Sequence, residues 1–408
     1  MSWSLADVEA SLGRLPRLQL ATLPTPLQEA PRLAAAIGLD RLLIKRDDNT
    51  GLAFGGNKAR KLEYLVADAA RLGADVLVTL GAPQSNHCRM TAAAARVAGL
   101  ECRLVFAGQP IEQVQGNMWL DRFFGATWTF AGDRPAPECM ASVADELRAS
   151  GRNPYVIPGG GSNGLGALGY VSCAFELAQQ LRERGEHPRY VVCAGGSCGT
   201  LSGLTLGVAL SGIDAEVVGV SISRSVPDRV AKVRQIMAES CGHLDLPVPD
   251  ASPTVWGDYI GRGYGMATEL SQRALETVAF SEGILLDPVY TAKAFGGLMG
   301  EIEAGRVRRS DLVVFVHTGG TPALFADPAE YSSRAQATFE GYGEVTYLVR
   351  GGEAEVLEGD WQPKRFFIIR FEDREKAMTW YNSQPYREVM KLRLASSTSN
   401  LFMVEGNR

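Results

Sequence analysis

The stretch "RYVVCAGGSCGTLSGLTLGVAL", residues 189–210, decides the fold. Its first six residues are mostly apolar and predict a buried strand, and its last ten predict a helix. The loop 195–200 between them is rich in glycine, so its backbone N–H groups can point at an anion with help from the helix dipole. A tight βα turn is the alternative. The loop lacks a Walker lysine and the G-x-G-x-x-G spacing, so a phosphomonoester is the better ligand.

The same alternation of strand and helix extends over residues 42 to about 325. Each predicted strand is short, apolar and closed by glycine or a polar turn. The predicted strands are 75–81, 101–108, 126–131, 189–196, 216–223 and 311–320. Helices are expected at 61–73, 112–125, 143–151 and 175–185. This alternation predicts an α/β fold with parallel sheets covered by helices on both faces, and the glycine-rich stretch 155–170 suits a crossing between two lobes.

The pattern changes after about residue 328 to α+β. Four short strands are expected, in "YLVRGG" (347–352), "AEVLEGD" (354–360), "RFFIIRF" (365–371) and "NLFMVEG" (400–406), with one helix over 373–396. We therefore expect two domains, 1–327 and 328–408.

The composition narrows the class of function. The chain of 408 residues has a net charge of −5, which gives no general support for binding nucleic acid or anionic membranes. Its seven cysteines are odd in number and show no C-x-x-C spacing, which argues against a disulfide framework and a zinc cluster, and we expect no metal. The first twenty residues lack a signal-peptide pattern, and no apolar run is long enough to span a bilayer. We expect a cytoplasmic protein.

Lys58, in "FGGNKARKLEYL" (54–65), stands at an expected helix start behind two glycines. A solvated surface lysine is the ordinary interpretation. The positive end of the helix dipole nevertheless disfavours a cation there. Burial would lower the pKa of the amine further and make it a nucleophile, which is what a Schiff-base lysine requires.

The stretch "QSNHCRMTAAAARVAGL" (84–100) opens another helix after a strand. Ser85, Asn86 and His87 offer a hydroxyl, an amide and an imidazole there. A helix cap needs only one of them, so the trio predicts a carboxylate site. The competing idea, a Ser–His–Asp hydrolase, lacks the G-x-S-x-G elbow.

Three further polar residues, Tyr264, Tyr290 and Thr318, are candidates for the site because they lie on predicted loops or at the end of a predicted strand. Tyr264 in "GRGYGMATEL" and Tyr290 in "LDPVYTAKA" are packing residues or site residues. Thr318 ends a strand, at the edge of the sheet where ligands of α/β proteins bind. We expect the neighbouring His317 to be a satisfied core histidine.

Together these motifs resemble a known family. "KRDD", "GGNKARKLEYL", "QSNH", "IPGGGSNGLGALGY", "GGSCGT", "LDPVYTAKA" and "HTGGTPALF" occur in this order. The same order is found in the pyridoxal-phosphate enzymes that include D-cysteine desulfhydrases, 1-aminocyclopropane-1-carboxylate deaminases and L-cysteate sulfo-lyases. The resemblance covers about residues 10–326. It implies the two-lobed fold of the tryptophan-synthase β-subunit type, with a small lobe of about 48–160 inserted in the large one.

The resemblance also implies roles for individual residues. Lys58 would bond pyridoxal 5'-phosphate and, once released, act as general base, with Asn57 beside it. The phosphate cradle would be formed by Gly196, Ser197, Cys198, Gly199 and Thr200. Asn86 would contact the phenolic oxygen of the cofactor ring, while Ser85, Asn86 and His87 would hold the substrate carboxylate. Tyr264 and Tyr290 would line the substrate side, so the implied catalytic residues are Lys58, Ser85, Tyr264 and Tyr290.

One departure from the family pattern points to the reaction. The ring-opening deaminases carry a glutamate facing the pyridine nitrogen, where this sequence has Thr291, and an apolar residue where it has Thr318. A neutral hydroxyl partner leaves the nitrogen unprotonated and the ring a weaker electron sink, which suits β-elimination. We therefore expect a D-cysteine-desulfhydrase-like carbon–sulfur lyase. L-cysteate sulfo-lyase and 1-aminocyclopropane-1-carboxylate deaminase activities are the alternatives, and a non-catalytic ligand sensor is the alternative outside enzymes.

The tail, 328–408, resembles small uncharacterised ferredoxin-like modules that pair into dimeric α/β barrels. Its usual first strand is missing or overwritten by the junction. The resemblance implies a role in dimerisation or regulation, so we expect a homodimer.

Overall fold

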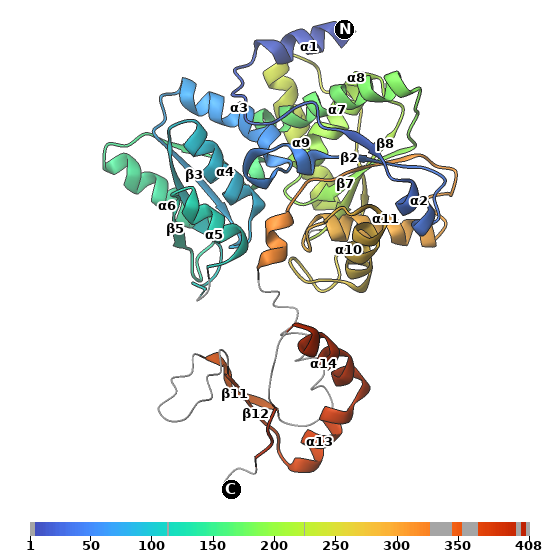
Figure 1. Cartoon of the computed structure of the whole chain (residues 1–408). Coiled ribbons are helices and arrows are strands. Elements are labelled where there is room, and N and C mark those ends of the chain that lie inside the picture. Colours follow the sequence, from blue (N-terminus) through green and yellow to red (C-terminus); the bar gives the residue numbers. More distant parts are fainter. Residues whose placement is uncertain are drawn as a thin grey trace. The chain divides into compact units, whose positions relative to one another are not determined.

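Two sheets of mostly parallel strands organise the first of two units, Met1–Asp327; the second unit is Pro328–Arg408 (Figure 1). The computed structural model describes residues 5–111, 114–223, 225–326, 345–352, 366–396 and 401–404. In both sheets every pairing is parallel except that of the edge strand β1 with β2. The predicted α/β class with parallel sheets is therefore confirmed.

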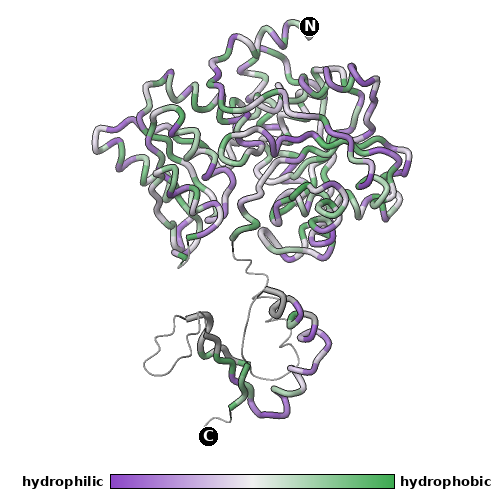
Figure 2. The backbone as a smooth tube through the Cα atoms, in the orientation of Figure 1, coloured by the Kyte–Doolittle hydropathy of each residue, from purple (hydrophilic) through white to green (hydrophobic). Residues whose placement is uncertain are grey.

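The larger sheet has six strands in the order β1-β2-β10-β7-β8-β9. These strands are β1 (Leu27–Glu29), β2 (Leu42–Lys45), β10 (Val313–Val316), β7 (Tyr190–Gly195), β8 (Glu216–Ser221) and β9 (Thr254–Trp256). Their central members appear as hydrophobic segments in Figure 2, as expected for strands buried on both faces.

Side chains of the larger sheet alternate between two hydrophobic clusters. Val191 and Cys193 pack with α7 (Gly164–Arg184), α8 (Gly199–Ser211) and α9 (Val226–Leu244). On the other face, Val192 packs with helices α2 (Pro31–Ile37), α10 (Glu269–Glu282) and α11 (Thr291–Glu303). Because successive residues of a strand point to opposite faces, one apolar run serves both layers.

The smaller sheet has four strands in the order β5-β4-β3-β6. They are β5 (Thr127–Phe130), β4 (Glu101–Phe106), β3 (Val76–Gly81) and β6 (Pro154–Val156). One face packs on α3 (Lys58–Arg71), α4 (Asn86–Val97) and α5 (Gly116–Phe123), and the other packs on α6 (Ala136–Ala149). The remaining helix of this unit is α1 (Leu5–Arg14), and short 3-10 turns lie at Asp47–Asn49, Leu52–Phe54, Gly159–Gly161 and Thr321–Phe325.

All six strands predicted in this unit are present, each within the predicted bounds. The helix predicted at 61–73 begins three residues earlier, at Lys58, and ends at Arg71; Leu72 is its C-cap, and Gly73 follows with a positive φ of 67°. The strand β6 was not predicted, because two of its three residues lie within the glycine-rich stretch 155–170 and the run is too short to show a period.

The second unit pairs β11 (Thr346–Gly352) antiparallel with β12 (Phe366–Arg370). The prediction of one helix over 373–396 was wrong: α13 (Arg374–Asn382) and α14 (Gln384–Ser396) are separated at Ser383. Pro385 lies in the first turn of α14, where its missing N–H does no harm, whereas it would break a continuous helix. The strand predicted at 354–360 lies outside the described residues, and 401–404 form no strand.

Candidate active site

A cavity of about 230 Å³ lies between the two sheets of the first unit. It is bordered by the carboxyl ends of strands β3, β7, β8 and β10, which is where ligands bind in open α/β sheets. The sequence-predicted residues that line it are Asn57, Lys58, Ser85, Asn86, His87, Gly196, Ser197, Cys198, Thr200, Tyr264, Tyr290 and Thr318. Residues more than 250 positions apart in sequence thus meet in one site.

Lys58 is the first residue of α3 and points its amine into the cavity. Its Nζ donates a hydrogen bond to Asn57 Oδ1 (2.8 Å). Burial lowers the pKa of Lys58 to about 8; the Asp287 carboxylate opposes this shift and the Arg89 guanidinium adds to it. A substantial fraction of the amine is therefore neutral and nucleophilic near neutral pH.

The glycine pair before Lys58 permits a close backbone approach. Gly55 and Gly56 have φ angles of 71° and 127°. A Cβ on Gly56 would lie 3.0 Å from the carbonyl oxygen of Thr318, and that same carbonyl accepts the Asn57 N–H at 3.0 Å. The glycines therefore allow the start of α3 to dock against the end of β10.

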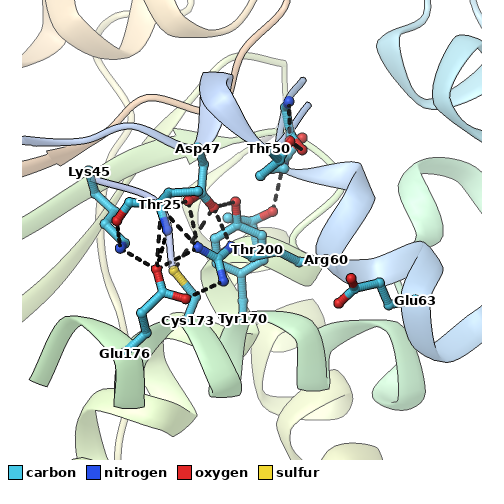
Figure 3. Close-up of polar contacts among 12 residues, drawn as sticks. Thr25, Lys45, Asp47, Thr50, Arg60, Glu63, Tyr170, Cys173, Glu176 and Thr200 are labelled. Atoms are coloured by element: carbon cyan, nitrogen blue, oxygen red, sulfur yellow. Dashed lines mark hydrogen bonds and ion pairs between the residues drawn. The ribbon is translucent and has the colours of Figure 1, made fainter. Parts of the chain in front are cut away.

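A network of buried charged residues also holds the first turn of α3 in place, through Arg60 (Figure 3). Arg60, fully buried, donates to both oxygens of Asp47 (Nε–Oδ2 2.8 Å, Nη2–Oδ1 2.9 Å) and to Glu176 (Nη1–Oε2 3.0 Å). Lys45 contacts Glu176, and the Tyr170 hydroxyl donates to Asp47 Oδ2 at 2.5 Å. Burial acts to raise the pKa of Asp47, but the charge of Arg60 and its hydrogen bonds outweigh it and hold that pKa below its ordinary value. Fixing Arg60 also fixes the turn of α3 that carries Lys58.

The glycine loop ends at the first residue of α8, Gly199. A Cβ on Gly199 would lie 2.7 Å from Ser162 Oγ and 2.8 Å from Lys61 Nζ, so only glycine fits there. Cys198, before it, adopts a left-handed backbone with φ of 74°. Arg229 Nη1 donates to the carbonyl of Gly196 at 2.5 Å, so this carbonyl has a buried partner. The loop thus presents a helix N-terminus to the cavity.

Lys61 was missed by the sequence analysis. Its side chain is 1% exposed, and its Nζ donates to the carbonyl of Gly160 (3.1 Å) and to Ser162 Oγ (3.4 Å). Burial, followed by the nearby charge of Lys58, lowers the pKa of Lys61 well below its ordinary value. Lys61 thus supplies a buried amine next to the glycine loop. Nothing local in the sequence separates it from a solvated lysine on the outer face of a helix.

Ser85, Asn86 and His87 begin α4, as their sequence indicated. Ser85 is the N-cap, and its Oγ accepts the N–H of Cys88 at 3.2 Å. Asn86 Oδ1 accepts from Arg89 Nη1 (2.9 Å), which orients the amide.

His87 lines the cavity, and both nitrogens of its ring face threonine hydroxyls. Its Nε2 is 2.8 Å from Thr79 Oγ1 and its Nδ1 is 3.5 Å from Thr91 Oγ1. Burial lowers the pKa of His87 well below its ordinary value, with the charges of Lys58 and Lys61 adding to the effect, so the ring stays neutral. The backbone at the start of α4, rather than the imidazole, is the part of His87 suited to a carboxylate.

Tyr264 and Tyr290 meet at the cavity, with their hydroxyl oxygens 2.5 Å apart. Burial raises the pKa of both phenols. Both hydroxyls therefore keep their protons at neutral pH.

Thr291 does not line the cavity. Its hydroxyl donates to Asp287 Oδ1 (2.8 Å) and accepts the Asp287 N–H (2.7 Å). Asp287, which the sequence analysis did not single out, also accepts the N–H groups of Val289 and Tyr290. Thr318 does line the cavity and remains the hydroxyl available to a ligand ring. His317 bonds the carbonyl of Leu285 (3.0 Å), which confirms it as a core histidine.

These groups fit pyridoxal phosphate. An aldehyde needs a neutral amine, which Lys58 provides. A phosphate needs hydrogen-bond donors, which the N–H groups of the glycine loop and the amine of Lys61 provide, and no carboxylate bonds to Lys61 among the described residues. No group of three or more His, Cys, Asp or Glu in this part of the chain is placed to hold a metal ion.

Comparison with known proteins agrees with this geometry. The family described as pyridoxal-phosphate dependent enzyme matches residues 18–319, and a domain of unknown function (DUF1330) matches residues 325–407. The chain therefore belongs to the pyridoxal-phosphate-dependent enzymes.

Particular relatives narrow this class. The chain is 46% identical over 322 residues to a D-cysteine desulfhydrase of Klebsiella pneumoniae (strain 342), covering 78% of this chain and 97% of the relative. A D-cysteine desulfhydrase of Serratia proteamaculans (strain 568) is 43% identical, covering 78% and 98%. The crystal structure of an ACC deaminase homologue, 37% identical, superposes with a TM-score of 0.73 over 81% of this chain and 98% of that one. The first unit is thus D-cysteine-desulfhydrase-like, and the predicted family and two-lobed fold are confirmed.

In the described part of the chain, no helix combines the length and the apolar character that crossing a membrane requires.

Proposed function

We propose that this enzyme catalyses α,β-elimination of D-cysteine to pyruvate, ammonia and sulfide. The observation that carries the choice is the charge of the cavity wall. Among the described residues, Lys58 is the only lysine or arginine that lines the cavity. Because Lys58 is needed for the cofactor, no cation is left to bind a sulfonate, whereas a thiol needs none. The likeness to enzymes named D-cysteine desulfhydrases supports the same choice.

Binding of the cofactor would use the groups described above. Lys58 would bond its aldehyde, the loop 196–200 with Lys61 would hold its phosphate, and Asn86 and Thr318 would face its ring. When bound, pyridoxal phosphate supplies an electron sink that weakens the Cα–H bond of an amino acid joined to it.

The protein's own groups would then handle the substrate and the protons. The Ser85 hydroxyl and the N–H groups at the start of α4 would bind the substrate carboxylate and orient Cα toward Lys58. The neutral Lys58 Nζ is the group able to take the Cα proton. Tyr264 and Tyr290 keep their protons, and one of them would give its proton to the departing sulfur as the Cβ–S bond breaks.

The alternatives fit these groups less well. L-cysteate sulfo-lyase activity would place a sulfonate in a wall that holds no second cation among the described residues. Ring-opening deamination is expected to use a carboxylate at the ring nitrogen. This sequence has Thr291 at that position of the family pattern, and the hydroxyl that lines the cavity is that of Thr318. A sensor without catalysis does not require the neutral amine of Lys58 together with the tyrosine pair.

A pyruvate-release assay tests the proposal. The substrates are D-cysteine, L-cysteine, L-cysteate, β-chloro-D-alanine, D-serine and 1-aminocyclopropane-1-carboxylate, with Lys58→Ala as the inactive control. We expect D-cysteine to give the highest kcat/KM, with sulfide released one-to-one with pyruvate. Faster sulfite release from L-cysteate, or 2-oxobutanoate from the cyclopropane substrate alone, would overturn the choice.

The homodimer, the cytoplasmic location and the regulatory or dimerising role of residues 328–408 stay predictions from the sequence.

A further inference from the structure

Tyr264, which lines the cavity, belongs to the segment 257–267 between β9 and α10. The backbone of this segment is rich in glycine and therefore conformationally free. It contains four glycines, at 257, 261, 263 and 265. Gly261, Gly263 and Gly265 have φ angles of 66°, 149° and 74°, which other residues rarely adopt. Glycine-rich backbone has many accessible conformations, so something outside this segment must hold Tyr264 in place.

Lys293, on α11, contacts this segment directly. Its side chain is 1% exposed, and its Nζ donates to the carbonyl oxygens of Ile260 (2.8 Å) and Gly263 (2.7 Å). Burial of a lysine amine is unfavourable unless hydrogen bonds compensate, and these two carbonyls supply them. We call these two hydrogen bonds of Lys293 the clamp. Gly263 directly precedes Tyr264 in the chain, so the clamp holds the backbone next to the phenol-bearing residue.

A second anchor of the same segment also lies on α11. The ring of Tyr259 packs where Gly297 and Gly300 leave room, since a Cβ on Gly300 would lie 2.5 Å from a ring carbon of Tyr259. The Tyr259 hydroxyl donates to Glu301 Oε1 at 2.7 Å. One face of α11 is therefore shaped to receive this segment.

The partner of Tyr264 belongs to the same helix. Tyr290 is the N-cap of α11, three residues before Lys293, and its hydroxyl oxygen is 2.5 Å from that of Tyr264. Helix α11 thus fixes Tyr290 through its own backbone and Tyr264 through Lys293.

We propose that Lys293 is a positioning residue that clamps segment 257–267 so that Tyr264 meets Tyr290 at the cavity. The catalytic part of this inference depends on the role of the tyrosine pair proposed above, whereas the clamp itself does not. Loss of the clamp frees the segment and separates the two phenols. Cofactor binding is unaffected, because Lys58, Lys61 and the glycine loop do not contact Lys293 among the interactions described.

The test uses the full-length, cofactor-loaded protein and its Lys293→Met variant. Arg262 is exposed and lies between the two clamped carbonyls, so trypsin cleavage after it reports release of the segment. Lys232→Met, at a partly exposed position of α9 whose Nζ donates to Gln235, is the matched control. Should Lys293→Met fail to fold, Lys293→Gln is the second variant. It also removes the amine, and its shorter side chain does not reach the carbonyls of Ile260 and Gly263 in the same way.

We expect Lys293→Met to be cleaved after Arg262 at least tenfold faster than the unchanged protein and the control, with the near-visible absorption of the cofactor retained. Turnover should fall at least tenfold. In a Tyr264→Phe background the same substitution should change turnover less than twofold, because the phenol it positions is already gone.

Unchanged cleavage at Arg262 would overturn the clamp. Equal losses of turnover with and without the Tyr264 hydroxyl would overturn its catalytic purpose. The cleavage measurement uses no substrate, so it stands even where D-cysteine proves to be the wrong substrate.

Discussion

The capture of pyridoxal phosphate by the cofactor-free enzyme should depend on pH through Lys58. Burial lowers the pKa of Lys58 from 10.5 to about 8. The difference of about 2.5 in pKa corresponds to about 3.4 kcal/mol against the ammonium form. At pH 7.5 about a quarter of such amines are neutral, against about 0.1% of ordinary lysines, a gain of about two hundredfold in reactive amine.

The assay follows the near-visible absorption after rapid mixing of cofactor-free enzyme with a fixed excess of cofactor, from pH 6 to 10.5. Below the pKa the amine is protonated, so the rate should rise about tenfold per pH unit and level off above about pH 8. Asp287→Asn should move the midpoint to lower pH, because the carboxylate now raises the pKa of Lys58. Asp145→Asn, an exposed position of α6, is the control and should leave it in place.

A rate that keeps climbing toward pH 10.5 would refute the reasoning, because it would mean that Lys58 is solvated like a surface lysine. A midpoint that moves to higher pH in Asp287→Asn would refute the claim that the Asp287 carboxylate raises the pKa of Lys58.

Two further perturbations test what holds the site. Arg60→Met leaves Asp47 and Glu176 without their shared cation and should lower the free energy of unfolding by about 3–5 kcal/mol, seen as a lower midpoint of urea unfolding. The control Arg71→Met, at an exposed ion pair, should lower it by less than about 1 kcal/mol. Equal midpoints for the two variants would contradict the role of the buried charges. Gly199→Ala places a methyl group 2.7 Å from Ser162 Oγ, so it should lower the free energy of unfolding by about 1–3 kcal/mol and raise the Kd for pyridoxal phosphate. The control Gly242→Ala, in open space on α9, should leave that Kd unchanged. An unaltered Kd in Gly199→Ala would contradict the role of loop 196–200 in binding the phosphate.

Local patterns in the sequence were enough for the six predicted strands of the first unit, the glycine loop and the start of α3, because apolar runs and glycines act over a few residues. They were not enough for Lys61, Lys293 or Asp287, whose burial and partners come from segments far away in the chain. His87 shows the limit most clearly. Its place at the start of α4 was predictable, but the direction of its ring depends on Thr79, which only the packing of α4 against β3 brings within 2.8 Å.

The central claim is that Lys58, and no other amine, bonds the cofactor. Borohydride reduction followed by trypsin digestion and mass spectrometry tests it directly, since modified lysine resists cleavage. We predict the pyridoxyl group on the peptide 47–60, uncut at Lys58. Its appearance instead on the peptide 61–71, which begins at the neighbouring Lys61, or on no peptide at all, would contradict the account.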